Sequence, residues 1–223
     1  WIGLVGSEMC IRDRLKGDKL HSFGAMLPGV PIVLYGNNQH IAWASANMKA
    51  DTQDLFVEKV GLLKPNTYYV NGQQKDMDIV EERIRIKAES PSSLREPIPE
   101  MLLRVRVTEH GPVISDVLQN IEVPMSLAWT GLVEDDQSYE ALLQINYASD
   151  WEEFRTSLAK LSAPALHYVY ADTSGNTGHS AAGDIPIRHH GSGSFPLEGW
   201  QEDNKWAGTI PFEQLHNKYN PED

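Results

Sequence analysis

Short apolar runs separated by turn-forming residues constrain the fold of this chain more than any other feature. Residues 30–35 (VPIVLY) form one such run, residues 40–46 (HIAWASA) form the next, and GNNQ lies between them. Glycine and asparagine tolerate the positive φ that tight turns require. The two runs therefore predict a β-hairpin that turns at residues 36–39.

Strand-like patterns continue in later segments. Residues 78–87 and 101–114 alternate apolar and polar side chains, and Gly111-Pro112 predicts a bend in the second of them. Residues 165–171 (ALHYVYA) run into the turn sequence DTSGN, after which TGHSAAG predicts a returning strand. Most of the chain is therefore expected to form short strands and turns.

Two helices are expected between these strands. Residues 138–148 have apolar side chains at helical spacing, and Ser149 with Glu152 matches a capping box at the start of the second helix. Four apolar residues of that helix should share one face, namely Trp151, Phe154, Leu158 and Leu161. From residue 185 onward the chain is rich in Gly, Pro and Trp and is expected to be irregular. A sheet-rich core with two adjacent helices indicates an α+β fold or a layered sandwich.

Residues 1–14 have neither helical nor strand periodicity, and they include Cys10, the single cysteine of the chain. The ten residues 4–13 resemble a translation of the transposon-end adapter used to prepare sequencing libraries. We therefore expect residues 1–14 to be a non-native, adapter-derived scar without ordered contacts. Residues 15–223 would then be a natural fragment that starts abruptly near Leu15 and has no cysteine for disulfides or thiol catalysis.

Charge and hydropathy exclude two classes of partner. The formal net charge is −12, and phosphate contact needs clustered Lys and Arg, so this chain is not expected to bind nucleic acid. It contains no apolar run of about 18 residues, the length that a membrane-spanning helix needs. The length of 223 residues suits one sizeable domain or part of a larger one.

Candidate chemical groups are few when they are judged by spacing alone. Asp51 and Asp54 could present two carboxylates to one Ca²⁺ ion, although acidic residues are also common at the start of a helix, and the pattern favours the helix start. The histidines lack zinc-site spacing, and His167, in an apolar strand, is typical of a core histidine. No G-x-S-x-G elbow is present. Spacing alone yields no complete catalytic set.

One long stretch stands out as a motif, GAMLPGVPIVLYGNNQHIAWASANMKADTQDLFVE at residues 24–58. Shorter segments follow it along the chain: TEHGPVISD (108–116), LAWTGL (127–132), YVYADTSGNTGHSAAGDIPIR (168–188), W-x-G-x-I-P-F (206–212) and YNP (219–221). This ordered series of segments resembles the penicillin acylase (penicillin amidase) family over essentially residues 15–223.

The resemblance implies an N-terminal nucleophile hydrolase with an αββα sandwich, here incomplete at both ends. Such enzymes are precursors that cut themselves and expose a serine, whose own α-amine acts as the base. That serine is expected upstream of Leu15, so residues 15–223 should be inert alone. The implied partners are a small-molecule amide substrate and the remaining α and β segments of the same precursor. The implied location is periplasmic or secreted.

The resemblance also implies roles for individual residues. Asn47 falls where the family uses a backbone N–H to hold the oxyanion, and Tyr35 and Ser45 fall at positions that line the acyl pocket. Arg188 matches an arginine that orients polar groups near the active site. His167 stands where the family usually has an asparagine, and its ring N–H is expected to donate to the oxyanion instead.

The family's calcium site falls on Asp51, the carbonyl of Gln53 and Asp54, so the resemblance implies a structural calcium ion and no organic cofactor.

The sequence leaves two questions open, the acyl group of the substrate and the class of function. The acyl group could be aromatic, as in penicillins, or a long aliphatic chain, as in acyl-homoserine lactones. The alternative function is a non-catalytic β-rich binding module for glycans that uses Trp200 and Trp206, although packing under the long C-terminal loops is the favoured reading for these tryptophans.

Overall fold

The computed structural model describes residues 11–27, 29–87, 99–118 and 120–222. The chain divides into two compact units. The first unit is drawn from Trp1–Thr52, Thr130–Ile187 and Gly208–Asp223, and the second from Gln53–Trp129 and Arg188–Ala207. In the described ranges, no helix is long and apolar enough to cross a membrane.

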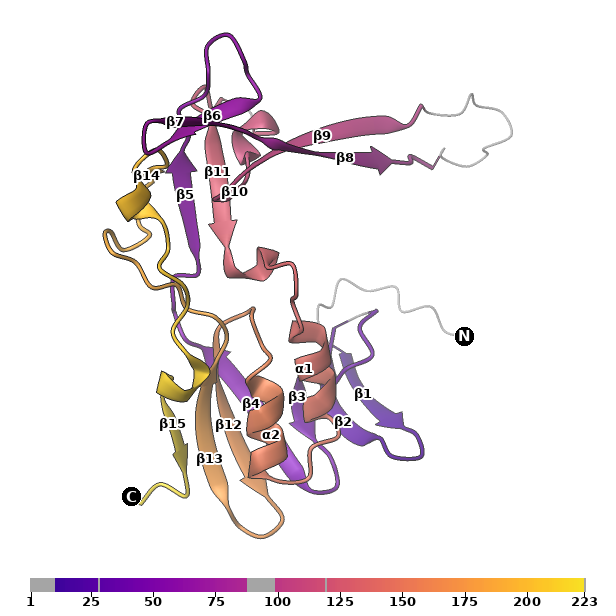
Figure 1. Cartoon of the computed structure of the whole chain (residues 1–223). Coiled ribbons are helices and arrows are strands. Elements are labelled where there is room, and N and C mark those ends of the chain that lie inside the picture. Colours follow the sequence, from indigo (N-terminus) through magenta and orange to yellow (C-terminus); the bar gives the residue numbers. More distant parts are fainter. Residues whose placement is uncertain (1–10, 28, 88–98, 119, 223) are drawn as a thin grey trace. The chain divides into compact units, whose positions relative to one another are not determined.

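The first unit is built on a seven-stranded antiparallel sheet (Figure 1). In spatial order its strands are β1 (Ile11–Lys16), β2 (His21–Met26), β3 (Tyr35–Asn37), β4 (Ile41–Asn47), β12 (Leu166–Asp172), β13 (Thr177–Ala182) and β15 (Asn217–Tyr219). The hairpin predicted around the DTSGN turn is confirmed as β12–β13. A hairpin also forms between β3 and β4, but its turn lies at residues 38–40 and not at 36–39, because Gly36 and Asn37 pair with β4. The two hairpins join through β4 and β12, which places Ser45 opposite Tyr168 and Asn47 opposite Leu166.

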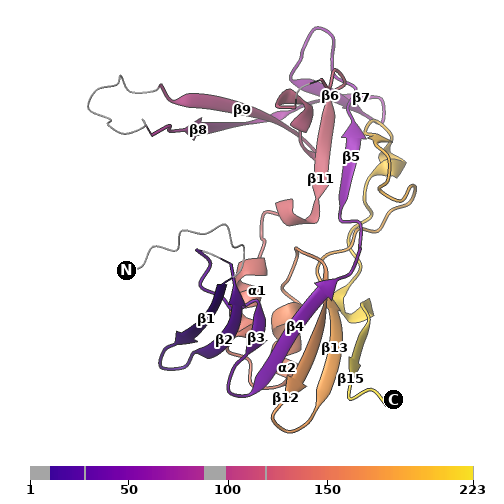
Figure 2. The ribbon, with the colours of Figure 1, turned by 180° about the vertical axis from the view of Figure 1, so that it is seen from behind.

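Helices α1 (Ser138–Ile145) and α2 (Trp151–Leu158) lie against one face of this sheet (Figure 2). They bury a core with the apolar side chains of the central strands, including Trp43, Tyr168 and Tyr170. The predicted apolar face of the second helix is confirmed, because Phe154 and Leu158 are fully buried. Two short 3₁₀ helices complete the unit, Thr130–Leu132 and Phe212–Gln214.

The start of α2 differs by one residue from the prediction. Asp150 is the N-cap, and its Oδ1 accepts a hydrogen bond from the Glu153 N–H at 2.9 Å. The Glu153 carboxylate in turn accepts from the backbone N–H and the hydroxyl of Ser149, each at 2.8 Å. The predicted pairing of Ser149 with Glu152 is therefore wrong, because aspartate supplies the cap and Glu153 occupies the third helical position.

The predicted strand over residues 30–35 is also wrong for most of its length. Only Tyr35 belongs to a strand, although Ile32 and Val33 are buried. The side-chain amide of Asn146 occupies both backbone groups of Val33: its Oδ1 accepts from the Val33 N–H and its Nδ2 donates to the Val33 carbonyl, each at 3.0 Å. These bonds replace a strand ladder and fix the segment against the end of α1.

Residues 11–14 overturn part of the expectation for the N-terminal segment. They lie in β1, which pairs antiparallel with β2 from Ile11 opposite Met26 to Lys16 opposite His21. The expected lack of ordered contacts is therefore wrong for residues 11–14. A free sheet edge offers backbone hydrogen bonds to any extended segment, whatever its side chains. Residues 1–10 lie outside the described residues, and the scar origin of residues 1–14 stays a prediction.

The second unit consists of small sheets. One is β10 (Gly111–Pro112), β9 (Met101–Thr108) and β8 (Asp78–Ile84), and another is β11 (Met125–Trp129), β5 (Gln53–Val57) and β14 (Leu197–Glu198). A further hairpin pairs β6 (Thr67–Val70) with β7 (Gln73–Asp76), and 3₁₀ helices span Ile114–Asp116 and Glu202–Asn204. The bend predicted at Gly111-Pro112 is a full reversal, because both residues pair back onto β9.

Candidate active site

A cavity of about 350 Å³ lies in the first unit, where β4 ends beside the start of β12. Three of its lining residues are the ones for which the sequence predicts acyl-pocket and oxyanion roles, Tyr35, Ser45 and Asn47. The remaining walls are mostly small and apolar, formed by Ala46, Ala50, Thr52, Pro164, Ala165 and Leu166. Residues from three separate stretches of the sequence therefore converge on one concave site of the kind that binds small molecules.

The cavity wall holds the polar side chains of Ser45 and Asn47 beside its apolar residues. The Ser45 hydroxyl oxygen is buried and finds no hydrogen-bond partner among the described residues, although buried polar atoms are usually satisfied. The Asn47 side chain accepts from the Lys49 N–H at 2.8 Å and so shapes the turn after β4, where Lys49 adopts a φ of 56°. Burial raises the pKa of Tyr168, directly opposite Ser45, so this phenol stays neutral.

Arg188 is not among the cavity-lining residues, and it forms a cluster in the second unit instead. Its Nε donates to Asp54 Oδ2 at 2.8 Å and its Nη2 donates to Asp54 Oδ1 at 3.2 Å. The indole Nε1 of Trp206 donates to the same carboxylate, and the guanidinium lies 5.7 Å from the Trp206 ring centroid. Asp54 lies inside strand β5, so the predicted helix start at Asp51–Asp54 is wrong.

A buried Glu58–His110 pair is a feature that sequence reasoning missed. Glu58 Oε1 accepts from Ser126 at 2.6 Å and Thr108 at 2.8 Å, and it lies 3.0 Å from His110 Nδ1. Both side chains are almost fully buried, at 0% and 3% exposure. Burial alone would raise the pKa of Glu58, but the hydrogen bonds from His110, Ser126 and Thr108 outweigh it and lower that pKa. The ionised carboxylate therefore joins the end of β5 to β9 and β11.

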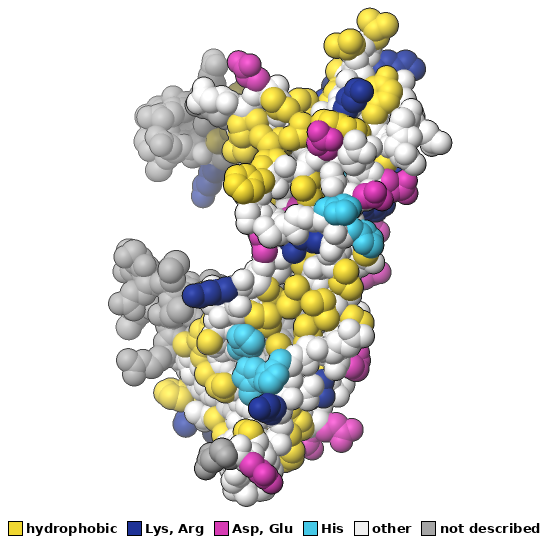
Figure 3. All heavy atoms as spheres, turned by 90° about the vertical axis from the view of Figure 1, so that its left-hand side faces the viewer, with side chains coloured by type: hydrophobic (Ala, Val, Ile, Leu, Met, Phe, Trp, Pro, Cys, Tyr) yellow, Lys and Arg dark blue, Asp and Glu magenta, His cyan; other side chains and the backbone are white. Residues whose placement is uncertain are grey.

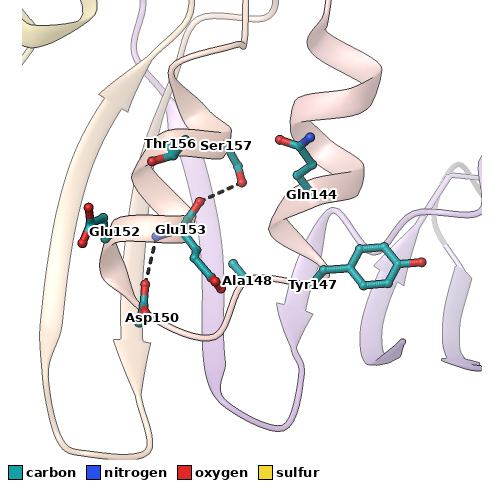
Figure 4. Close-up of a pocket in the computed structure, with 8 residues that line it drawn as sticks. All are labelled: Gln144, Tyr147, Ala148, Asp150, Glu152, Glu153, Thr156 and Ser157. Atoms are coloured by element: carbon teal, nitrogen blue, oxygen red, sulfur yellow. Dashed lines mark hydrogen bonds between the residues drawn. The ribbon is translucent and has the colours of Figure 1, made fainter. Parts of the chain in front are cut away.

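A larger cavity of about 570 Å³ lies between α1 and α2 (Figure 4). Two of its polar side chains bond within α2 itself: Asp150 caps the helix by accepting from the Glu153 N–H at 2.9 Å, and the Ser157 hydroxyl donates to the Glu153 carbonyl one turn earlier at 2.8 Å. The close-up shows no nucleophile paired with a base. The residues with predicted acyl-pocket and oxyanion roles line the smaller cavity beside β4 and β12 and not this one.

His167 lies next to the cavity in sequence but its ring joins a group of histidines. Its Nδ1 is 3.1 Å from His179 Nε2, and the His179 and His216 ring centroids are 5.1 Å apart. Histidine side chains gathered together are visible in Figure 3 (cyan). Burial first, and then the neighbouring His167, His216 and Lys218, lower the pKa of His179, which keeps its ring neutral. Leu166 lines the cavity, and His167 is not among its lining residues.

Comparison with known proteins decides the family. The sequence profile of the family described as penicillin amidase matches residues 2–223. The chain belongs to the penicillin amidase family. Among its relatives are acyl-homoserine lactone acylases QuiP of Pseudomonas fluorescens, 30% identical over 198 residues, and of Pseudomonas syringae pv. syringae, 31% identical over 200 residues. Each alignment covers 87% of this chain and 23% of the relative. A penicillin acylase 2 proenzyme of a Pseudomonas species is 24% identical and covered over 26% of its length.

The solved structures confirm the fold class. A thermostable penicillin G acylase from Alcaligenes faecalis matches with a TM-score of 0.72 and 23% identity, over 96% of this chain and 37% of that chain. The α+β fold expected from the resemblance is therefore confirmed, and the first unit supplies one sheet with helices on one face. The chain spans about a quarter of the length of the curated relatives, 23% for the QuiP acylases.

The calcium site implied by the penicillin amidase resemblance does not fit Asp54 in this arrangement. Both oxygens of its buried carboxylate accept N–H groups, and two of these come from the guanidinium of Arg188, whose positive charge opposes a divalent cation. Among the described residues, no group of three or more His, Cys, Asp or Glu side chains is placed to hold a metal ion. Asp51 belongs to the first unit and Gln53 to the second. Calcium binding by Asp51, Gln53 and Asp54 stays a prediction that requires Arg188 to leave Asp54.

The oxyanion role of His167 also stays a prediction, and its contact with His179 allows a test. His167→Ala and His179→Ala remove the same ring-to-ring hydrogen bond, so we expect both to lower the unfolding free energy by a similar amount, about 0.5–1.5 kcal/mol. Urea denaturation of the two variants measures this. In the complete processed enzyme, a loss of about 10²–10³ in kcat confined to the His167 variant would instead establish an oxyanion donor.

Proposed function

We propose that the complete protein hydrolyses carboxylic amides through an acyl-enzyme, and that this chain contributes part of its active site. The observation that carries the proposal is the single cavity that holds Tyr35, Ser45 and Asn47 together. In this reading Tyr35 and Ser45 line the acyl pocket, and the backbone N–H of Asn47 donates to the oxyanion. The Asn47 side chain is committed to the turn at Lys49, which agrees with a role that needs only the backbone.

The nucleophile belongs to a segment outside this chain. We propose a serine freed by self-cleavage of the precursor, because its α-amine, with a pKa of about 7.7–8.0, is partly unprotonated near neutral pH and can act as the base. The serine hydroxyl attacks the amide carbonyl as the α-amine takes its proton, and the leaving amine then receives that proton. Water hydrolyses the resulting ester by the same base. Export to the periplasm or medium is part of this proposal.

The acyl group that fits this reading best is aliphatic. The cavity walls are mostly alanine, proline and leucine side chains, without an aromatic box around them. Two of the similar relatives are acyl-homoserine lactone acylases by name, which supports a fatty-acyl amide as the substrate class. The alternative of a glycan-binding module uses exposed tryptophans, and it is disfavoured because the Trp206 indole is committed to Asp54.

Filling the cavity tests the proposed acyl pocket. In the complete enzyme, Ala50→Phe should lower kcat/KM for long-chain acyl amides by about 10–200-fold, because the lost volume equals several methylene groups. Acetyl amides should be hydrolysed almost as before. Ala159→Phe is the matched control, because Ala159 is exposed at the end of α2 in the same unit. Unchanged chain-length preference in the Ala50 variant would remove this cavity from the substrate site.

A further inference from the structure

The β6–β7 hairpin of the second unit (Figure 1) turns on Asn71-Gly72, the one Asn-Gly pair in the sequence. Val70 pairs with Gln73, so these two residues alone form the turn. Both have positive φ, 48° for Asn71 and 74° for Gly72, as a type I′ hairpin turn requires. Because glycine has no side chain, its backbone nitrogen is the least hindered one that can follow an asparagine.

The tip of this turn is open in the described structure. Asn71 and Gly72 are both exposed. A Cβ built on Gly72 would meet no described atom within 4 Å beyond its chain neighbours, so there is room at the turn for a ring and for water. Gly72 has no partner residue in the β6–β7 ladder, so its N–H is not needed for strand pairing.

We propose that Asn71 is a site of spontaneous deamidation, and that the product loosens residues 200–204 from the hairpin. The Gly72 nitrogen attacks the side-chain carbonyl carbon of Asn71 and loses its proton, and the side-chain amide takes up that proton and leaves as ammonia. The product is a succinimide ring. One water molecule then opens the ring at either carbonyl group, which yields aspartate or isoaspartate. The net change replaces an amide by a carboxylic acid, with water as the co-reactant.

The new carboxylate would form at a contact between two segments. Asn71 joins the hairpin to residues 200–204 by two hydrogen bonds: its N–H donates to the Trp200 carbonyl and its Nδ2 donates to Glu202 Oε2, each at 2.9 Å. A carboxylate at position 71 has no N–H to offer Glu202 and repels it at the same short distance. Lys75, which also interacts with Glu202, is paired with another carboxylate at 2.7 Å. Isoaspartate also lengthens the backbone of the turn.

Asn220 is a matched control within the same chain. It is exposed, its φ is 45°, and its Nδ2 donates to Asn176 Oδ1 at 2.8 Å, so its backbone and its side-chain bonding resemble those of Asn71. The next residue is Pro221, which has no backbone N–H. Its nitrogen therefore has no proton to lose, and ring closure with release of ammonia is blocked.

Peptide mapping of the folded 223-residue chain tests the inference. The chain is incubated in mildly alkaline buffer, and mass spectrometry follows the conversion of each asparagine, with an isoaspartyl methyltransferase assay for isoaspartate. We expect Asn71 to convert at least tenfold faster than Asn220 and to give both products. Equal conversion at the two positions, or conversion of Asn71 only after the chain is unfolded in urea, would overturn the inference.

Two variants test the effect on the neighbouring segment. Asn71→Asp introduces the charge of the aspartate product, and aspartate tolerates the positive φ of this position. Hydrogen exchange of residues 200–204 should be faster in this variant than in the parent chain. Adding Glu202→Gln should return the exchange to near the parent rate, because the repulsion is removed. Exchange in Asn71→Asp that stays at the parent rate would overturn the proposed loosening.

Discussion

Asp54→Ala is expected to lower the free energy of unfolding by about 3–5 kcal/mol, because it leaves the guanidinium of Arg188 buried without its carboxylate. The Asp54 side chain is 1% exposed and that of Arg188 is 12% exposed, so water cannot replace the lost partner well. Trp206 also loses its acceptor. Denaturant unfolding of the variant beside the parent chain measures the loss.

A matched control is available in the same unit. Arg106 donates to both oxygens of Asp116, with distances of 2.7 and 2.6 Å, but Asp116 is 30% exposed. Asp116→Ala should therefore cost only about 0–1 kcal/mol. Similar losses of unfolding free energy in the two variants would show that burial does not make the Asp54–Arg188 pair more important for stability than an exposed pair.

The response to calcium distinguishes an Asp54 that pairs with Arg188 from an Asp54 that binds a calcium ion. If Arg188 and Trp206 occupy its carboxylate, the melting temperature of the parent chain should be the same in millimolar calcium and in a chelator. A calcium-dependent rise in melting temperature that Asp54→Ala abolishes would restore the calcium site predicted for Asp51, Gln53 and Asp54.

Glu58→Ala is the second large expected effect. It removes the acceptor of Thr108, Ser126 and His110, and each buried donor left without a partner costs about 1–3 kcal/mol. Glu81→Ala is the control, because that carboxylate has an arginine partner but is half exposed. Equal melting temperatures for the two variants would contradict the role assigned to the buried network.

The same network predicts a direction for acid unfolding. The folded-state pKa of Glu58 lies below its ordinary value of 4.5, so its contribution is complete above about pH 4.5 and is lost as the pH falls through the folded-state pKa. The stability difference between the parent and Glu58→Gln should therefore shrink on acidification. Other titratable groups lie near this network: Glu109 and Tyr68, with Lys75 and Lys205 paired to Glu109. Their contributions are common to both proteins, so the difference in unfolding free energy between the parent and Glu58→Gln isolates that of Glu58. A difference that grows below pH 4.5 would contradict the assignment.

Local features of the fold were predictable from the sequence, and long-range ones were not. The β3–β4 turn, which lies at residues 38–40, and the DTSGN turn follow from nearby side chains. Asn38 Oδ1 accepts from the Ile41 N–H at 2.8 Å, and the Asp172 carboxylate accepts from the Asn176 side chain at 2.8 Å. Residues 30–34 failed as a strand because their partner, Asn146, lies more than a hundred residues away. Apolar residues alone do not reveal such an amide.

In the candidate site, too, some residues were predictable from the sequence and others were not. The resemblance placed Tyr35, Ser45 and Asn47, and the structure brings them into one cavity. It assigned Asp54 and Arg188 to separate roles, a metal site and an active site, whereas the two side chains pair with each other across 134 positions. Glu58 and His110 were passed over because neither stands in a recognisable motif, and only the fold shows that one carboxylate serves three donors.

The central claim is that this chain is part of an amidase whose nucleophile lies elsewhere in the polypeptide. The most direct measurement compares release of free carboxylic acid from acyl amides by the 223-residue chain and by the complete precursor. The precursor should turn over substrate, with a serine at the new N-terminus of its cleaved chain, and the 223-residue chain should show no turnover. Hydrolysis by the 223-residue chain that a substitution within residues 15–223 abolishes, or an uncleaved and inactive precursor, would contradict the claim.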